Sequence, residues 1–413
     1  MLHYTAPPVV GGVEGVIEAH ARVFLEAGYP VTVVAGQGDA GALPVGTEMV
    51  EIPEMNSQHP EIAAMSTALE KGKLPQNFTV LKQNLRRKLN MVLDGFDTVI
   101  VHNVFTKHFN LPLTAALWDL LDEGAITNCI AWHHDFTWTS RRSRWKVHEG
   151  YPWDLLRTFR SDVINVTVSE ERREELRELY QCPREEIRVI YNGVDPKGMY
   201  GLGSAGWDLC QRLGLLAADL ILLMPVRVTR AKNIEFALEV AAALAASGLR
   251  LKLVLTGPPD PHDDKSMAYF RELQARRDEL GLSEVMHFVY ESGPNSAERY
   301  VIDLNVVADL YRLADVLFMP SHQEGFGMPV LEAGLLGLPV AASTAVPAAV
   351  EIGGNDIFVF DLDQPAADLA EELALWAEDD ARLSLARRTR QRYTWHAIFH
   401  NEIEPLLTLQ PAE

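Results

Sequence analysis

Two glutamates, Glu324 and Glu332, flank a loop with the composition of an anion-binding site. Its glycines precede Pro329, a residue suited to the first turn of a helix, so the sequence predicts a helix N-terminus there. The unpaired N–H groups of such an end attract phosphate, and glycine lets a ligand approach the backbone. Because carboxylates repel a diphosphate, both glutamates fit best if they accept hydrogen bonds from hydroxyls beside it, as in a nucleotide sugar. The alternative is that both glutamates are structural, one as a helix-capping residue and the other as a buried residue of the helix. The donor-binding residues predicted in this stretch are Gly325, Phe326, Gly327, Met328 and Glu332.

Basic residues gather after the expected strand 220–228, where Arg227, Arg230 and Lys232 precede a helix that opens at Asn233. Ligands of open α/β sheets bind beyond the carboxyl ends of the strands, so this loop places fixed positive charge near another strand end. Fixed cations there would neutralise a departing diphosphate. The alternative is a solvated basic loop, which the acidity of the whole chain makes less attractive.

Two loops of the N-terminal half follow strands in the same way. Gly11 and Gly12 stand directly before a helix and offer backbone amides to an anion, although a glycine pair is also an ordinary turn. His133 and His134 follow the strand NCIAW, where an imidazole could hydrogen-bond a sugar hydroxyl or steady developing charge. The alternative is a structural histidine, and no third ligand lies at zinc spacing.

A basic run, Thr139–Lys146, follows the histidine loop and carries four cations within six residues. Arg141 and Arg142 are the predicted acceptor-binding residues of this run, together with His134 from the loop before it. They would hold an anionic acceptor, with Trp145 as an apolar face for a sugar ring or chain. A solvated surface loop and an anionic membrane surface are the alternatives.

The elements that position these loops alternate between short apolar strands and amphipathic helices along the whole chain. Such strands are apolar throughout, which is typical of parallel sheets covered on both faces. The sequence predicts two Rossmann-like, doubly wound α/β domains with parallel sheets facing a cleft. An N-terminal, acceptor-side domain covers 1–195 and a nucleotide-sugar-binding domain 196–390, with a glycine-rich hinge at 196–210. A C-terminal helix in 391–413 packs back on the first domain.

Composition narrows the class of protein. The 413 residues are 47% hydrophobic and carry a formal net charge of -20, from 57 acidic and 37 basic residues. This charge argues against nucleic acid as a partner. The three cysteines form no metal-ligand spacing, the N-terminus lacks the features of a signal peptide, and prolines and glycines interrupt the uncharged stretch 333–350. We therefore expect a cytoplasmic protein without a transmembrane segment.

These residues together resemble glycosyltransferase family 4, a family of retaining enzymes with the GT-B fold. The resemblance is carried by PPVVGGVEGVIEAHARVFLEAGYPVTVV, VTVSEE, VIYNGVD, PVRVTRAKN, LVLTG, LADVLFMPSHQEGFGMPVLEAGLLGLPVAAS and RYTW. It implies that Glu324 orients the donor sugar and Glu332 binds the ribose, while Arg227 and Lys232 bind the diphosphate. Gly11 and Gly12 match the glycine-rich loop, and His133, or less favoured His134, matches a strand-end histidine near the donor sugar.

The resemblance also implies the reaction. We expect a metal-independent hexosyltransferase without a cofactor, acting by front-face substitution with retention, on a small-molecule or glycan acceptor. The chain departs from the family at one point. After the strand PVAAS the family usually has a Pro-Glu pair, whereas this chain has Pro347-Ala348. The alternatives are a nucleotide-sugar epimerase or hydrolase of the same architecture, a non-catalytic sugar-nucleotide-binding protein, and a metal-dependent enzyme using Asp361 and Asp363.

Overall fold

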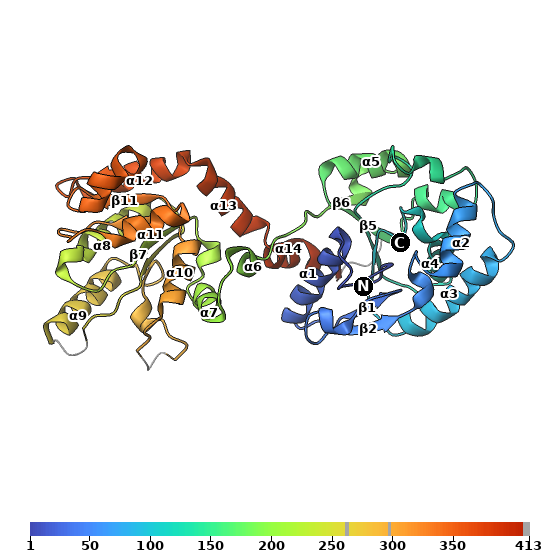
Figure 1. The fold of residues 1–413 in the computed structure, drawn as a ribbon, viewed down its shortest axis with the longest axis horizontal. Helices are drawn as coiled ribbons and strands as arrows, with labels where there is room; N and C mark the ends of the chain where they lie inside the picture. Colours follow the sequence, from blue (N-terminus) through green and yellow to red (C-terminus); the bar gives the residue numbers. More distant parts are fainter. Residues whose placement is uncertain (261–263, 296–298, 408–413) are drawn as a thin grey trace. The chain divides into compact units, whose positions relative to one another are not determined.

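The computed structural model describes residues 1–260, 264–295 and 299–407 (Figure 1). The chain divides into two compact units: unit 1 is Met1–Gly193 with the chain from Trp395 onward, and unit 2 is Val194–Thr394. The boundaries thus fall a few residues from those expected from the sequence. Among the described helices, none is both long and apolar enough to cross a membrane.

Unit 1 is built on parallel strands. A two-stranded and a four-stranded sheet, the latter in the order β3-β4-β5-β6, are joined through Leu2, which bridges both Val34 and Val101. Helices cover both faces, and buried apolar side chains fill the space between helices and strands. The strands are β1 (Thr32–Ala35), β2 (Glu48–Glu51), β3 (Val99–His102), β4 (Cys129–His133), β5 (Val163–Thr167) and β6 (Ile187–Val189). The main helices are α1 (Gly12–Glu26), α2 (Pro60–Leu69), α3 (Phe78–Leu93), α4 (Leu111–Asp122) and α5 (Glu170–Tyr180).

The C-terminal segment completes unit 1. It consists of α14 (Trp395–Ile398), a π-helical turn at Phe399–Ile403, and α15 (Glu404–Leu407). Phe399 and Ile403 are fully buried in the same core as the apolar face of α1, because Phe399 packs edge-on against Phe24 at 4.8 Å between ring centroids.

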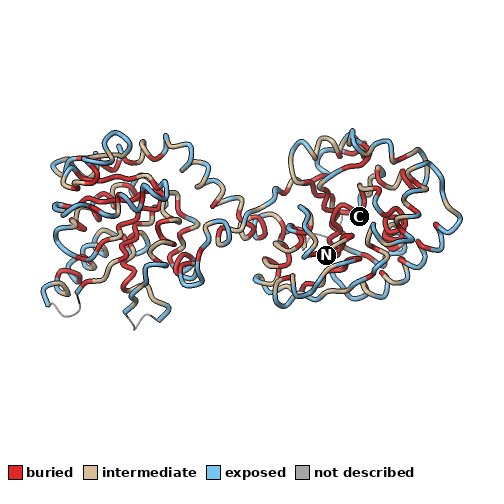
Figure 2. Tube along the Cα trace, viewed as in Figure 1, coloured by how far each residue is buried: buried red, intermediate tan, exposed pale blue. Residues whose placement is uncertain are grey.

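Unit 2 is a single doubly wound sheet of six parallel strands in the order β12-β11-β10-β7-β8-β9. One face is covered by α8, α9 and α12, and the other by α7, α10 and α11. The strands between these two layers of helices are therefore buried on both faces (Figure 2). The strands are β7 (Leu220–Met224), β8 (Leu251–Leu255), β9 (Met286–Phe288), β10 (Val316–Met319), β11 (Val340–Ser343) and β12 (Phe358–Phe360). The helices are α6 (Pro196–Tyr200), α7 (Ser204–Arg212), α8 (Ile234–Ala246), α9 (Asp264–Glu279), α10 (Leu304–Leu313), α11 (Met328–Leu336), α12 (Ala366–Asp379) and α13 (Ala381–Arg392).

Both parallel, doubly wound units agree with the predicted fold class, whereas the predicted hinge at 196–210 is wrong. That segment forms α6 and α7, because Leu209 and Cys210 are fully buried in the core of unit 2. A buried ion pair also belongs to this unit: the Arg390 guanidinium on α13 lies 2.9 Å from the Asp315 carboxylate, with both side chains at most 5% exposed.

Candidate functional site

The loop between β10 and α11 makes a glycine obligatory at position 327. Gly327 has φ 100°, and a Cβ added there would lie 2.6 Å from Cγ1 of Val346. This left-handed residue turns the chain directly into α11, which starts at Met328 with Pro329 in its first turn. Gly325 faces open space, and Phe326 and Met328 are exposed, so the predicted anion-binding loop leaves the N-terminus of α11 accessible.

Glu324, from this loop, is held by a cation and a hydroxyl. The Lys232 ammonium lies 2.6 Å from Oε1 of Glu324, and Ser321 Oγ donates to the same oxygen at 2.9 Å. Ser321 is itself fixed by Ser343, whose hydroxyl donates to its carbonyl oxygen at 2.6 Å. The lysine and glutamate side chains are only 20% and 11% exposed, so water screens this pair weakly. Two residues that the sequence singled out separately therefore form one charged pair.

The loop after β7 carries the cations. Lys232 ends a short 3-10 turn, Arg230–Lys232, and Asn233 then adopts a left-handed conformation with φ 52° before α8 begins. The backbone N–H of His322 donates to the carbonyl of Ala231 at 2.8 Å, which ties this loop to the glutamate loop.

Arg227 and Arg230 differ in their surroundings. Arg230 is paired with Glu272 at 2.7 Å, so its charge is already neutralised. Arg227 is exposed and borders a cavity of about 630 Å³ whose wall also includes Thr229, Lys265 and Ser266. Arg230 lines the same cavity, so both cations border it, but Arg230 is held there by an ion pair with Glu272.

Glu332 lies one turn into α11 and is exposed, yet it is not a free side chain. The hydroxyl of Tyr311 on α10 donates a hydrogen bond to Oε2 of Glu332. Tyr311 is 4% exposed, and its burial together with this hydrogen bond raises the pKa of the phenol. Sequence reasoning missed Tyr311, because its position on an apolar helix face is also that of an ordinary core residue.

The glycine pair of unit 1 stands beside a carboxylate. Gly12 starts α1, and a Cβ on Gly11 would lie 2.1 Å from the carboxylate of Glu14, which itself accepts a 2.5 Å hydrogen bond from Thr5. Glutamate in the first turn already complements the positive end of the helix. Both glycines are exposed, but Glu14 beside them favours hydroxyl groups over a bare anion there.

His133 does not have the geometry of a ligand-binding residue. Its side chain is 1% exposed, and its ring nitrogens face Asn165 at 3.1 Å and Thr106 at 3.4 Å. Burial lowers the pKa of His133 to about 4, so the ring is neutral at physiological pH. His133 is the last residue of β4 and is buried, whereas the prediction that it rather than His134 lies near the donor sugar stays a prediction.

His134 is only half-buried and stands one residue further along, beyond the strand. Its Nε2 lies 3.4 Å from Nδ1 of His102, and the two rings stack at 5.7 Å. Burial and the neighbouring His3 lower the pKa of His134 to about 3. A neutral imidazole at the carboxyl end of β4 can exchange a hydrogen bond with a ligand hydroxyl.

The predicted basic run splits into two classes. Arg144 stacks over Trp138 at 4.2 Å, and Lys146 pairs with Glu70 at 2.8 Å, so both serve the structure of unit 1. Arg141 and Arg142 are exposed, and Trp145 beside them is 62% exposed. Lys107, a cation that the sequence analysis did not single out, follows β3. Burial lowers the pKa of its ammonium group.

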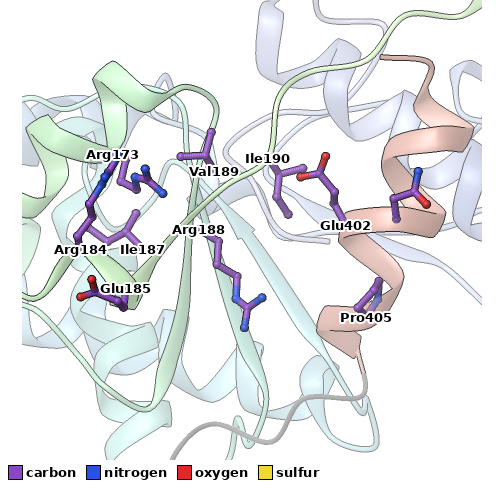
Figure 3. A pocket seen from close by; sticks show the side chains of 10 residues that line it. Arg173, Arg184, Glu185, Ile187, Arg188, Val189, Ile190, Glu402 and Pro405 are labelled. Carbon is purple, nitrogen blue, oxygen red and sulfur yellow. The ribbon is translucent and has the colours of Figure 1, made fainter. Parts of the chain in front are cut away.

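Another cavity of about 630 Å³ in unit 1 lies apart from every predicted residue. Figure 3 shows it between Arg188 on the edge strand β6 and the C-terminal helical segment that carries Glu402 and Pro405. Arg173 and Arg184 line it too, but both are paired with Glu170. None of its lining residues belongs to the candidate site, so we assign it no part in the function.

One of the two aspartates proposed for metal dependence has a hydrogen-bond partner. Asp361 accepts a hydrogen bond from Thr344 at 3.0 Å, and α12 begins after Pro365 rather than at an aspartate cap. Within residues 1–260, 264–295 and 299–407, no group of three or more histidine, cysteine or carboxylate side chains is arranged to hold a metal ion.

Similar proteins come from several organisms. A D-inositol 3-phosphate glycosyltransferase from Thermobispora bispora is 33% identical over 56% of this chain and 52% of its own length, and one from Actinosynnema mirum is 29% identical over 55% and 50%. The chain thus spans about half the length of the curated relatives it matches. The crystal structure of HepE from Anabaena with UDP and glucose aligns over 99% of both chains at 17% identity, with a TM-score of 0.36.

Two family models match the chain. "Glycosyltransferase Family 4" matches residues 10–197, and "Glycosyl transferases group 1" matches residues 211–393. The first match covers most of unit 1 and the second most of unit 2. Because the two matches together span nearly the whole chain and contain all the predicted site residues, the protein belongs to the group 1 and family 4 glycosyltransferases.

Proposed function

We propose that this protein transfers a hexosyl group from a nucleotide diphosphate sugar to an acceptor hydroxyl, with retention of anomeric configuration. The observation that carries the proposal is the Lys232–Glu324 pair, 2.6 Å apart, beside the open N-terminus of α11. It combines a cation for a phosphate with an acceptor for sugar hydroxyls. Family membership supports the same reaction class.

Donor binding adds new partners to this pair. The diphosphate takes the N–H groups at the start of α11 and the charges of Lys232 and Arg227. Lys232 then shares its donors between phosphate and Glu324, and the second carboxylate oxygen of Glu324 accepts from a hydroxyl of the sugar. Glu332 accepts from the ribose hydroxyls. Each carboxylate thereby binds hydroxyls rather than phosphate, which resolves the repulsion between carboxylates and a diphosphate.

Transfer breaks the bond between the anomeric carbon and the phosphate oxygen and forms one to the acceptor oxygen on the same face of the sugar. The acceptor proton passes to an oxygen of the leaving diphosphate. Negative charge accumulates on that diphosphate in the transition state, where Lys232 and Arg227 stabilise it without reorganisation. These fixed cations support a metal-independent reaction that needs no cofactor.

Unit 1 is the proposed acceptor side. Arg141 and Arg142 are suited to an anionic group, Trp145 to a sugar face, and His134 to a hydroxyl. The two relatives described above are named for an inositol 3-phosphate reaction, which supports a small phosphorylated polyol as the acceptor class.

A donor screen tests the proposal. Thermal unfolding with UDP, ADP or GDP in EDTA should give a higher midpoint for at least one of them, since a ligand of the folded state stabilises it by mass action. The corresponding nucleotide sugar should then turn over with a polyol phosphate present. An epimerase or hydrolase would instead consume donor at its full rate without acceptor, and a non-catalytic protein would bind without turnover.

A further inference from the structure

Tyr311 is the strongest candidate for a functional residue outside the predicted set. It lies on α10, 21 residues before Glu332, and its hydroxyl donates to one oxygen of that carboxylate. Its ring is packed in the core of unit 2 together with Val330 and Ala333 of α11. The Tyr311 hydroxyl is thus a hydrogen-bond donor held in place by the core, and it contacts an exposed glutamate.

We propose that Tyr311 is a positioning residue that sets Glu332 in the orientation required to bind the ribose of the nucleotide donor. The inference rests on the proposed function, because it assumes that Glu332 contacts a nucleotide. A phenol has one proton to donate, and here it is given to Oε2. Oε1 is left to accept from ribose hydroxyls.

The arrangement makes physical sense for an exposed helix residue. A glutamate side chain has three rotatable bonds and loses that freedom when it binds a ligand. A buried tyrosine has few conformations, so its hydrogen bond restricts the glutamate before the ligand arrives. The raised pKa of Tyr311 keeps the phenol protonated across the physiological range, and the donor is therefore always present.

Glu324 is restricted in a similar way by Ser321 and Lys232. Both glutamates of the site thus receive a hydrogen bond from a buried hydroxyl, although the two hydroxyls come from different elements. The similarity argues against the Tyr311 contact being only a means of satisfying a buried phenol.

The experiment compares two ligands that differ by the nucleoside. Calorimetric titration of the full chain with inorganic pyrophosphate probes the phosphate subsite alone, while UDP, or whichever of UDP, ADP and GDP the wild type binds, also probes the ribose contact. Tyr311→Phe removes only the hydroxyl and should weaken nucleoside diphosphate binding about three- to tenfold, the loss expected for one hydrogen bond, and leave pyrophosphate binding within twofold. Tyr29→Phe is the matched control, since its hydroxyl donates to Glu404 at 3.0 Å in unit 1; it should change neither.

Three further variants guard the test against a folding defect. Glu332→Asp shortens the side chain at an exposed helix position and should reproduce the selective loss of nucleoside diphosphate affinity. Combining Glu332→Gln with Tyr311→Phe should weaken binding no more than Glu332→Gln alone, because the two residues act through one contact.

Equal weakening of pyrophosphate and nucleoside diphosphate, unchanged binding in Tyr311→Phe, or additive losses in the double variant would overturn the positioning role. If the wild type binds pyrophosphate but no nucleoside diphosphate, the proposed function fails first, and the role of Tyr311 fails with it.

Discussion

Units 1 and 2 are both built on parallel strands but place charge differently around their candidate residues. In unit 2 the carboxylates are already engaged, Glu324 by Lys232 and Glu332 by Tyr311. In unit 1 the candidate groups are neutral imidazoles and the exposed guanidinium groups of Arg141 and Arg142. The difference indicates that the candidate carboxylates on the proposed donor side already have partners without a ligand, whereas the arginines on the proposed acceptor side are exposed.

The largest expected effect concerns how unit 2 is stabilised. Arg390→Met leaves Asp315 buried without its partner, which should cost about 3–5 kcal/mol of unfolding free energy. Hydrogen exchange measured at increasing urea concentrations should show that peptides of unit 2 lose protection at lower urea than peptides of unit 1. The exposed pair of Arg250 and Asp219 offers a control, because Arg250→Ala should cost less than about 1 kcal/mol. Equal effects of the two variants would contradict the importance of the buried pair.

Catalysis should depend strongly on the cation paired with Glu324. Lys232→Ala removes charge stabilisation from the leaving diphosphate and frees Glu324, so kcat should fall about 10²–10³-fold. Initial rates with saturating donor measure this, with Arg250→Ala as the charge-matched control in the same unit. A decrease of less than about threefold would remove Lys232 from the site.

Acid should destabilise unit 1 more than unit 2. Among the described residues, His3, His20, His102, His108, His133 and His134 of unit 1 have lowered pKa values, against His287 alone in unit 2. Below about pH 6.5 the histidines of the unfolded chain bind protons, whereas the same rings in the folded protein stay neutral. The free energy of unfolding therefore falls as the pH drops towards the pKa values of the folded state.

His133 alone, with its pKa near 4, should remove about 2 kcal/mol between neutrality and pH 5. Hydrogen exchange at pH 7 and pH 5, corrected for intrinsic rates, would measure this unit by unit. Uniform destabilisation of both units would argue against the histidines as its source.

The smallest effect is expected on the proposed acceptor side. Reversing the charge of Arg141 and Arg142 to glutamate should raise KM for a phosphorylated acceptor about tenfold, through loss of exposed charge-assisted hydrogen bonds, and leave donor KM unchanged. Lys71→Glu, at another exposed cation of unit 1, is the control. Unaltered acceptor kinetics would make the two arginines ordinary surface residues.

Residue spacing predicted the architecture and the α11 loop, because glycine before proline at a strand end has few other structural uses. The pairing of Lys232 with Glu324, 92 residues apart, follows from the adjacency of β7 and β10 at one sheet edge, which sequence order alone does not reveal. The burial of His133 could not be predicted from its position at a strand end, because both faces of β4 are covered and every residue of the strand is buried. Tyr311 was missed because a buried tyrosine gives the same helical pattern whether or not its hydroxyl contacts a site.

The most direct test of the proposed metal-independent donor site in unit 2 is hydrogen exchange of the full chain in EDTA, with and without the nucleoside diphosphate that stabilises it most. We predict slower exchange in peptides covering 227–233 and 321–332 of unit 2, at ligand concentrations near Kd and without divalent metal. Protection that appears only after Mg²⁺ or Mn²⁺ is added, or that leaves both segments unchanged in the bound protein, would contradict the account.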